Sequence, residues 1–263
     1  TLFRSSVALE DMEACEYVLK ILMDDNSLKV IQTKSQYSIR QIGTHSVVLD
    51  ILAEDSTGQI YEIEMQTGDK PGHIRRVRYI TSSIDTSFLD KGNDYTKLPE
   101  LHIFYITTFD IANAHKTVYD IIRIDSETHI EFDNGVHEHY INTIVNDGST
   151  ISNLMHYFNN TDSRNMNYGA LSKRVKYLKE SKGGNSYMCE FIEKIQQESH
   201  DIGRLEGLRE GRREGQLEGG IQTLIIDNLE DGKSKDIIIM KLEKRFGLSP
   251  EDAEYNYNKC LNK

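Results

Sequence analysis

Two acidic side chains and an amide stand in the segment HSVVLDILAEDSTGQIYEIEMQ with a spacing that suits the chemistry of a divalent cation. Asp50 lies within a short apolar run, and Glu64 and Gln66 follow in the next apolar segment. An ionised carboxylate is costly in apolar surroundings unless it is paired or holds a metal. Mg²⁺ takes oxygen ligands, usually one or two protein carboxylates together with water and substrate phosphate oxygens. The pattern therefore indicates a cation held against a phosphodiester.

Two strands joined by a turn must position these side chains. The first apolar run ends in turn residues at 54–58, and alternating apolar residues then predict a second strand. Side chains alternate between the two faces of a strand, so Glu62, Glu64 and Gln66 share one face. The same alternation is typical of a strand that faces solvent, and Asp50 also fits a turn cap or a partner for an arginine.

A basic helix is predicted directly after the second strand, over residues 73–89. Its apolar residues recur at three- to four-residue spacing, and a proline–glycine pair precedes it. Arg75 and Arg78 fall on one face of this helix, and Arg76 and Tyr79 fall on another. The helix is therefore suited to present guanidinium groups to a nucleic-acid backbone, or to form a solvated basic face that pairs with acids elsewhere.

A first helix is predicted over residues 12–23, with Asp11 as its N-cap. Glu10, Glu13 and Glu16 lie at its start, where a carboxylate interacts favourably with the helix dipole. We take Glu13 as the candidate for an additional acid at the metal, although a glutamate in a first turn is usually only a dipole partner.

Short strands are predicted on either side of these elements. Segments 28–32 and 37–42 indicate a strand and a more polar approach to the strand of Asp50. Residues 101–107 form a strand that follows a helix, so we expect it to run parallel to a neighbour in the core. Segments 118–124 and 139–145 predict edge strands, and residues 152–200 turn helical.

His137 and His139 lie on one face of a strand and are a candidate zinc pair. No third ligand stands near them in the sequence. Asn134 and Gly135 directly before them are typical of a hairpin turn, so a turn is the simpler interpretation of this segment.

Several segments, in a fixed order, carry a resemblance to a known family. They are VLDI at 48–51, YEIEMQ at 61–66, RVRY at 76–79, GNDY at 92–95, HIFYI at 102–106 followed by Phe109 and Asp110, and a late tract rich in Arg, Glu and Gly. Together they resemble the PD-(D/E)XK nuclease superfamily. More narrowly, they resemble the recombination-promoting nuclease (Rpn) or putative transposase group, whose last core motif is E-x-Q instead of E-x-K. The resemblance covers roughly residues 3–220, and it also implies that a short segment precedes Thr1 in related chains.

The resemblance implies an α/β fold with a restriction-endonuclease-like core, in which helices flank a mixed central sheet, and a C-terminal helical extension. It makes Asp50 and Glu64 metal ligands, with the backbone carbonyl of Met65 as a third oxygen. Gln66 takes the position usually held by lysine. An amide can orient a water or a phosphate oxygen, but it neither accepts a proton near neutral pH nor supplies positive charge. The proton of the attacking water must then be removed in another way: a metal lowers the pKa of this water, and a substrate phosphate oxygen or solvent accepts the proton.

Three residues of the basic helix, Arg76, Arg78 and Tyr79, match a recurring motif of the resembled group, which makes them candidates for DNA binding. The two arginines are also candidates to supply the positive charge that Gln66 lacks. The implied cofactor is Mg²⁺, for which Mn²⁺ can substitute, and the implied partner is DNA.

Composition limits these expectations. The chain has 263 residues and a formal net charge of -11, whereas nucleic-acid binders usually carry a basic balance. We therefore expect a local basic patch, metal-dependent binding or a different partner rather than tight non-specific binding of DNA. Three cysteines, far apart, form no ligand pattern, and no long apolar run or signal peptide is present. A cytoplasmic protein without membrane contact is expected.

A repeat with glycine at every fourth position runs from 203 to 219, with glutamate at 206, 210, 214 and 218. Such a ridge of small residues lets a second helix approach closely, so the tract predicts a homo-oligomer, with a flexible charged spacer as the alternative. Helices are predicted over 221–230 and 234–246, and a third starts near Pro250. The expected domains are a nuclease-like core at 1–150, helices packed on it at 151–200, a linker helix at 201–220 and a helical module at 221–263.

Two functions follow. The first is a metal-dependent DNA endonuclease that hydrolyses phosphodiester bonds and is associated with recombination, mobile elements or defence, as the resemblance implies. The alternative is a catalytically silent protein of the same fold that acts as an oligomeric DNA- or protein-binding factor. The set of Asp50, Glu64 and Gln66 favours the first, and the acidic charge and the missing lysine favour the second.

Overall fold

The computed structural model describes residues 7–39, 46–69, 71–160 and 162–261. Between residues 188 and 210 many side chains lie outside this description. The chain divides into two compact units, Thr1–Ile195 and Gln196–Lys263.

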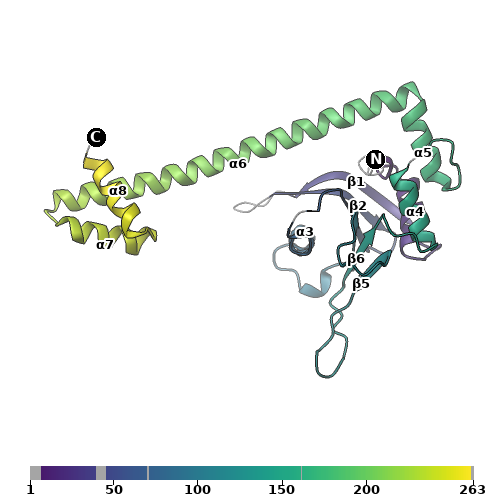
Figure 1. Ribbon diagram of the computed structural model, residues 1–263, viewed down its shortest axis with the longest axis horizontal. Helices are drawn as coiled ribbons and strands as arrows, with labels where there is room; N and C mark the ends of the chain where they lie inside the picture. Colours follow the sequence, from purple (N-terminus) through teal and green to yellow (C-terminus); the bar gives the residue numbers. More distant parts are fainter. Residues whose placement is uncertain (1–6, 40–45, 70, 161, 262–263) are drawn as a thin grey trace. The chain divides into compact units, whose positions relative to one another are not determined.

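A six-stranded mixed sheet forms the centre of the first unit (Figure 1). In spatial order its strands are β1 (Val30–Ile39), β2 (Val47–Asp55), β3 (Ile60–Gln66), β4 (Leu101–Thr107), β6 (Val136–Asn142) and β5 (Val118–Ile121). The first three strands pair antiparallel, β4 runs parallel to both β3 and β6, and β5 returns antiparallel to β6. The predicted α/β fold and the parallel position of the fourth strand are confirmed.

Helices cover both faces of this sheet (Figure 1). They are α2 (Met12–Leu22), α3 (His73–Phe88), α4 (Thr150–Asn159) and α5 (Gly169–Glu180), with a short 3₁₀ helix η1 (Tyr95–Lys97) before β4. On one face, Val77, Ile80 and Ile84 of α3 pack against apolar side chains of the sheet. On the other face, α2, α4 and α5 enclose a second apolar cluster, to which α2 contributes Cys15 and Val18. The sheet is therefore buried on both sides, as its apolar central strands require.

Local sequence explains where the elements around the acidic residues begin and end. Asp11 caps α2 as predicted, because its carboxylate accepts a hydrogen bond of 3.0 Å from the Ala14 N–H. In the turn between β2 and β3, the buried Asp55 carboxylate accepts the N–H groups of Thr57 and Gln59, and Gly58 takes a φ of 88°. The turn thus fixes the register of the hairpin on which Asp50 and Glu64 stand.

Two details of the predicted strands are wrong. The segments near 28–32 and 37–42 belong to one continuous strand, β1. Its pairing with β2 is irregular between Val30 and Gln32, and Gln36 takes a φ of 46°. Residues 40–45 lie outside the described part. Asn134 and Gly135 do not form the hairpin turn before β6. The chain turns instead at 125–130, where the N–H of Asp125 donates to the carbonyl of Ile130. The Asp125 side chain stabilises this turn, because its carboxylate accepts the N–H and the hydroxyl of Thr128.

The hairpin between β5 and β6 projects from the sheet as an arm, residues 121–133 (Figure 1). Only one isolated bridge, between Ile124 and Glu131, joins its two sides. Large apolar side chains of the arm are exposed by half or more of their surface at Ile122, Ile124, Ile130 and Phe132. An exposed apolar set of this density is unusual on a folded domain.

Helix α6 (Lys182–Glu230) contains the whole glycine tract, so the tract is helical. A Cβ added at Gly207, Gly211, Gly215 or Gly219 would meet no atom within 4 Å. The side chains at positions 206, 209 and 210 and the surroundings of Gly203 lie outside the described residues.

The second unit is a helical module that begins at Gln196, within α6. The end of α6 packs with α7 (Lys235–Phe246) and α8 (Pro250–Leu261) around Ile225, Ile238, Leu242 and Tyr257. Gly247 ends α7 with a φ of 66°. Among the helices that the structure describes, none combines the length and the apolar character needed to cross a bilayer.

Candidate metal centre

Three carboxylates gather on β2 and β3. Asp50 stands within β2, and Glu62 and Glu64 stand on the face of β3 that α3 covers. The two glutamates are buried, with relative exposures of 0% for Glu62 and 3% for Glu64. Asp50 is only partly buried. The hairpin therefore places three acids in a region where ionised groups are costly.

Asp50 is oriented by two hydrogen bonds. Its Oδ1 accepts the Nε2 of Gln36 at 3.0 Å, and its Oδ2 accepts the backbone N–H of Met65 at 2.9 Å. The N–H and C=O of one strand residue point towards the same neighbouring strand. The carbonyl of Met65 therefore faces β2 and Asp50, as a third oxygen ligand would have to.

Glu64 is held by Arg76 of α3. The Nε of Arg76 donates to Oε1 of Glu64 at 3.0 Å, and its Nη2 donates to the same oxygen. The side chain of Arg76 remains half exposed, whereas that of Glu64 is buried. Arg76 is thus paired with a carboxylate of the hairpin, and its predicted contact with DNA stays a prediction.

Glu62 is the site residue that the sequence analysis missed. In the part of the chain that the structure describes, no hydrogen-bond donor reaches either oxygen of Glu62 or Oε2 of Glu64. The alternation of 62, 64 and 66 was a signal that Glu62 shares the face of Glu64. Its burial was not visible, because a solvent-facing strand shows the same alternation.

Burial controls the protonation of these acids. It raises the pKa of Glu64 to about 7, helped by the charge of Asp50 and opposed by Arg76. Burial, followed by the charges of Glu64 and Asp50, raises the pKa of Glu62 well above its ordinary value. The pKa of Asp50 is also raised by burial, against the hydrogen bonds from Met65 and Gln36. A cation would compensate the acids that the single guanidinium of Arg76 does not, so the oxygen set fits a divalent metal.

A metal held by all three acids needs a change of side-chain rotamer. Oxygens that share one cation lie roughly 4 to 5 Å apart at most, because each ligand distance is about 2.1 to 2.6 Å. Asp50, Glu62 and Glu64 are not among the described groups of three ligands that meet a limit of 4.8 Å. The three acids, as they are placed, therefore do not all converge on one cation.

One family model matches residues 16–153, which is 138 of the 263 residues, and its description is PD-(D/E)XK nuclease family transposase. The chain belongs to this family. The matched span contains the whole of the hairpin, α3 and β4, and thus the nuclease motifs around Asp50, Glu64 and Gln66. No curated protein and no solved structure matches the chain. Nucleases of the PD-(D/E)XK family act on nucleic acid with divalent metal ions, so the family confirms the predicted resemblance and a nuclease- or transposase-like function.

The other candidate site residues differ in their burial and in their distance from Asp50 and Glu64 along the fold. Gln66 is half-buried at the end of β3, and its Nε2 lies 3.5 Å from the carbonyl of Gly68. Arg78 is exposed on α3, and Tyr79 packs against the core on the α3 side of the sheet. Glu13 is exposed in the first turn of α2, on the opposite face of the nuclease core from α3 and outside the matched span. Among the described contacts, none joins it to Asp50 or Glu64.

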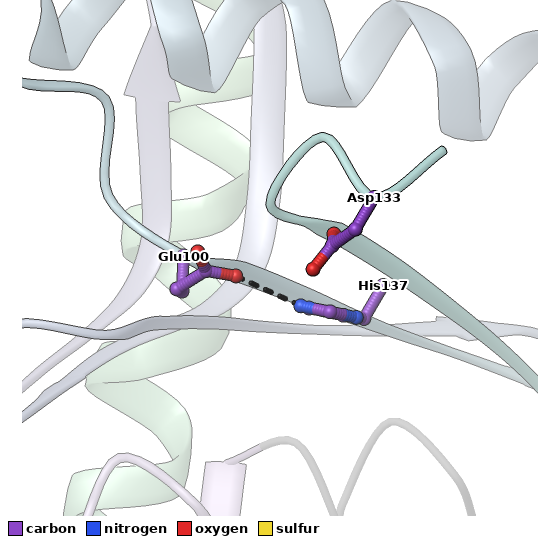
Figure 2. A group of neighbouring side chains, drawn as sticks. All are labelled: Glu100, Asp133 and His137. Atoms are coloured by element: carbon purple, nitrogen blue, oxygen red, sulfur yellow. Dashed lines mark hydrogen bonds and ion pairs between the residues drawn. The ribbon is translucent and has the colours of Figure 1, made fainter. Parts of the chain in front are cut away.

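A second group of ligand-type side chains lies at the other end of the parallel strands of the nuclease core. Figure 2 shows Glu100, Asp133 and His137, whose ligand atoms lie within 4.8 Å of one another. The Nε2 of His137 lies 2.9 Å from Oε2 of Glu100. Both acids are exposed, and exposed acids often gather without a metal. The group is on the opposite sheet face from Glu64, since His137 stacks on His102, which stacks on Tyr61.

The two histidines of the candidate zinc pair have different neighbours. His139 binds Asp120 through its Nδ1 at 2.6 Å and stacks on Phe104, whereas His137 turns towards Glu100 and Asp133. Glu100 precedes β4, and only the pairing of β4 with β6 brings it next to His137. The local sequence around the histidines carried no sign of this contact.

Proposed function

We propose that this protein is a metal-dependent DNA endonuclease that hydrolyses phosphodiester bonds at the site of Asp50 and Glu64. The observation that supports the proposal is the set of three buried or half-buried acids beside a single guanidinium. A protein without use for a cation gains nothing from buried carboxylate oxygens that accept no hydrogen bond. The family membership supplies the substrate class and the reaction type.

Asp50, Glu64 and the Met65 carbonyl would hold the ion, which we take to be Mg²⁺, with Mn²⁺ as a substitute. When bound, such an ion lowers the pKa of water and neutralises charge on phosphate oxygens. The chain itself orients Asp50 through Gln36 and the Met65 N–H, and it orients Glu64 through Arg76. These contacts fix two ligands before substrate arrives, which reduces the cost of binding.

Two polar residues near the centre would contact substrate. The amide of Gln66 can orient a water or a phosphate oxygen but cannot take up its proton. Arg78 is exposed on α3 and is suited to bind a DNA phosphate, with Tyr79 supporting the helix from its buried side. Arg76 would act on the substrate only through Glu64 or after leaving it.

The cellular setting follows from the family and from the cysteines. Recombination, mobile-element activity or defence are the processes that suit a nuclease of the transposase type. Cys15, Cys189 and Cys260 are all free thiols, which agrees with a reducing cytoplasm. The open glycine positions of α6 leave room for a second helix, so we expect a homo-oligomer through this tract.

A second candidate function is a catalytically silent DNA- or protein-binding factor. The ion pair between Arg76 and Glu64 favours it, because a salt bridge can satisfy one of the metal ligands without any metal. The lack of a lysine at Gln66 favours it as well. The proposal of an endonuclease and this alternative differ in one measurable property, which is the breaking of a phosphodiester bond.

Cleavage of supercoiled plasmid with Mg²⁺, Mn²⁺ or EDTA tests the proposal. We expect nicked or linear product with either metal, none with EDTA, and a loss of rate on the order of 10² to 10³ in Asp50→Asn and Glu64→Gln. Glu100→Gln is the matched control, since it removes one carboxylate from the group on the opposite sheet face. Equal activity in all variants would overturn the site. Retention of DNA on a gel without cleavage under either metal would favour the binding factor.

A further inference from the structure

The arm, residues 121–133, carries an apolar set that its own chain does not cover. Ile122, Ile124, Ile130 and Phe132 are 62%, 50%, 60% and 63% exposed. Side chains of this size are rarely exposed together unless a partner covers them. Because the arm extends an edge strand, β5, its position on the sheet is also one that proteins normally protect from other chains.

The arm is also acidic. Its sequence from 121 to 133, IIRIDSETHIEFD, holds four acids and a single arginine, and a fifth acid, Asp120, directly precedes it. Asp120 is bonded to His139. Asp125 accepts the N–H of Thr128 in the turn, and Asp133 accepts the N–H of Gly135. The side chains of Glu127 and Glu131 make no hydrogen bond or ion pair among the described residues. The partner of the arm must therefore be apolar and basic, which excludes a second arm and disfavours the phosphate backbone of DNA.

Helix α5 offers a surface of the required kind. On its outer side Lys173, Lys176 and Tyr177 are exposed, and Tyr177 keeps 44% of its surface open. Neither lysine has an acidic partner in the part of the chain that the structure describes. Lys173 and Lys176 are three residues apart on a helix, so they lie on one face. Arg174 stacks over Tyr177 and holds the aromatic ring in place.

Within one chain the arm does not reach this helix. Figure 1 shows the arm pointing away from the sheet at β5 and β6, and α5 at the far side of the same unit beside α4. A second copy can bring the two surfaces together. In a two-fold dimer each arm would cover the α5 of its partner, and the contact would occur twice, which is the usual symmetry of homodimers.

We propose that the arm, residues 121–133, docks on α5 of a second copy of this chain, with Glu127 and Glu131 facing Lys173 and Lys176. This contact is independent of the proposed nuclease activity and of the glycine tract in α6. It joins an apolar centre to a charged rim, the arrangement typical of specific interfaces. Because the rim is formed by exposed charges, the association weakens as the ionic strength rises.

Sedimentation of the full chain over a range of concentrations tests the proposal through charge reversal. We expect Lys173→Glu/Lys176→Glu to weaken self-association by at least about tenfold. Glu127→Lys/Glu131→Lys should do the same, and the combination of all four changes should restore it. Lys91→Glu/Lys97→Glu is the matched control, because it changes the net charge equally at exposed positions outside both surfaces. All these residues are on the surface, so the variants keep the fold.

Replacement of the apolar side chains gives a second measurement. Ile124→Ser/Ile130→Ser should also weaken association, without any change of charge. A wild-type chain that stays monomeric at all concentrations would overturn the proposal. So would reversal variants that associate as tightly as the wild type, or a fourfold variant that fails to regain association. Plasmid cleavage is read separately, so loss of the dimer contact cannot be confused with failure of the nuclease site.

Discussion

Arg76 donates two hydrogen bonds to one oxygen of Glu64, Oε1, and among the described residues no donor reaches the other oxygen, Oε2. Oε1 is therefore held by the protein, whereas Oε2 is available to bind a cation. Glu62 lies two residues away on the same face. Among the described residues, no hydrogen-bond donor reaches either of its buried carboxylate oxygens. If all three acids were ionised, the site would hold more negative charge than Arg76 neutralises, so the protonation of the acids depends on pH and on cations.

The first prediction concerns stability against pH without metal. The pKa of Glu64 is about 7 in the folded chain and near 4.5 in the unfolded chain, so between these values the native state binds more protons. Stability is then fully present below pH 4.5 and falls as the pH rises towards 7. The loss is up to about 3 kcal/mol, because each pKa unit corresponds to 1.36 kcal/mol. Urea unfolding in EDTA at pH 5 and pH 7.5 measures this loss.

Glu62→Gln and Glu64→Gln test whether the buried glutamates cause this loss of stability with rising pH. Each substitution keeps the side-chain volume and removes one titrating group, so the pH dependence should become shallower in both. A saturating divalent cation should flatten it in the wild type, since metal binding favours the deprotonated acids. A wild-type stability that rises between pH 5 and pH 7.5 in EDTA would contradict the raised pKa.

The second prediction concerns Arg76. Arg76→Met removes the positive partner of a buried carboxylate, which destabilises the metal-free protein at pH 7.5 by about 1 to 3 kcal/mol. The figure is below the 3 to 5 kcal/mol of a fully buried pair, because half of the arginine side chain is exposed. Arg75→Met is the control on the exposed side of the same helix, with an expected change within about 0.5 kcal/mol. Equal losses for both variants would mean that Arg76 contributes only to the surface charge.

The hairpin of Asp50 and Glu64 could be predicted because its signals are local. Both strands and their turn lie within twenty residues. A short apolar run marks the first strand, and the alternation of apolar side chains marks the second. The burial of Glu62 could not be predicted, since it depends on α3 covering that face. The pairing of Arg76 with Glu64 needs the docking of the same helix. Glu100 and His137 meet only through the parallel pairing of β4 and β6, whose partners are 35 residues apart in the sequence.

The third prediction tests the amide at the end of β3. Gln66→Lys brings back a positive charge that can act on the transition state, so we expect plasmid cleavage to become about tenfold faster, a gain of about 1.4 kcal/mol. Gln66→Met keeps a similar length without a polar end and should be slower than the wild type. If Gln66→Lys is as slow as Gln66→Met, the amide itself has a role that a cation cannot replace.

The fourth prediction separates a structural acid from a metal-binding one on α2. Asp11→Ala removes the cap of the helix and should cost about 1 kcal/mol in urea unfolding, with no effect on the affinity for Mn²⁺. Glu13→Ala should have little effect on stability, because Glu13 is exposed. Titration with Mn²⁺, followed by electron paramagnetic resonance, shows whether Glu13 also serves the metal. A weaker affinity in Glu13→Ala alone would assign it as an additional ligand.

The three thiols of the chain differ in chemical reactivity. Cys15 is buried in the apolar stripe of α2, and burial raises its pKa to about 12, so it is almost never a thiolate near neutral pH. Cys260 is partly covered in α8, whereas Cys189 on α6 is exposed. Since only the thiolate reacts with alkylating reagents, maleimide probes will attach to Cys189 first and will leave Cys15 untouched in the folded protein. The native sequence thus provides a labelling position on α6, and modification of Cys15 becomes a chemical reporter of unfolding.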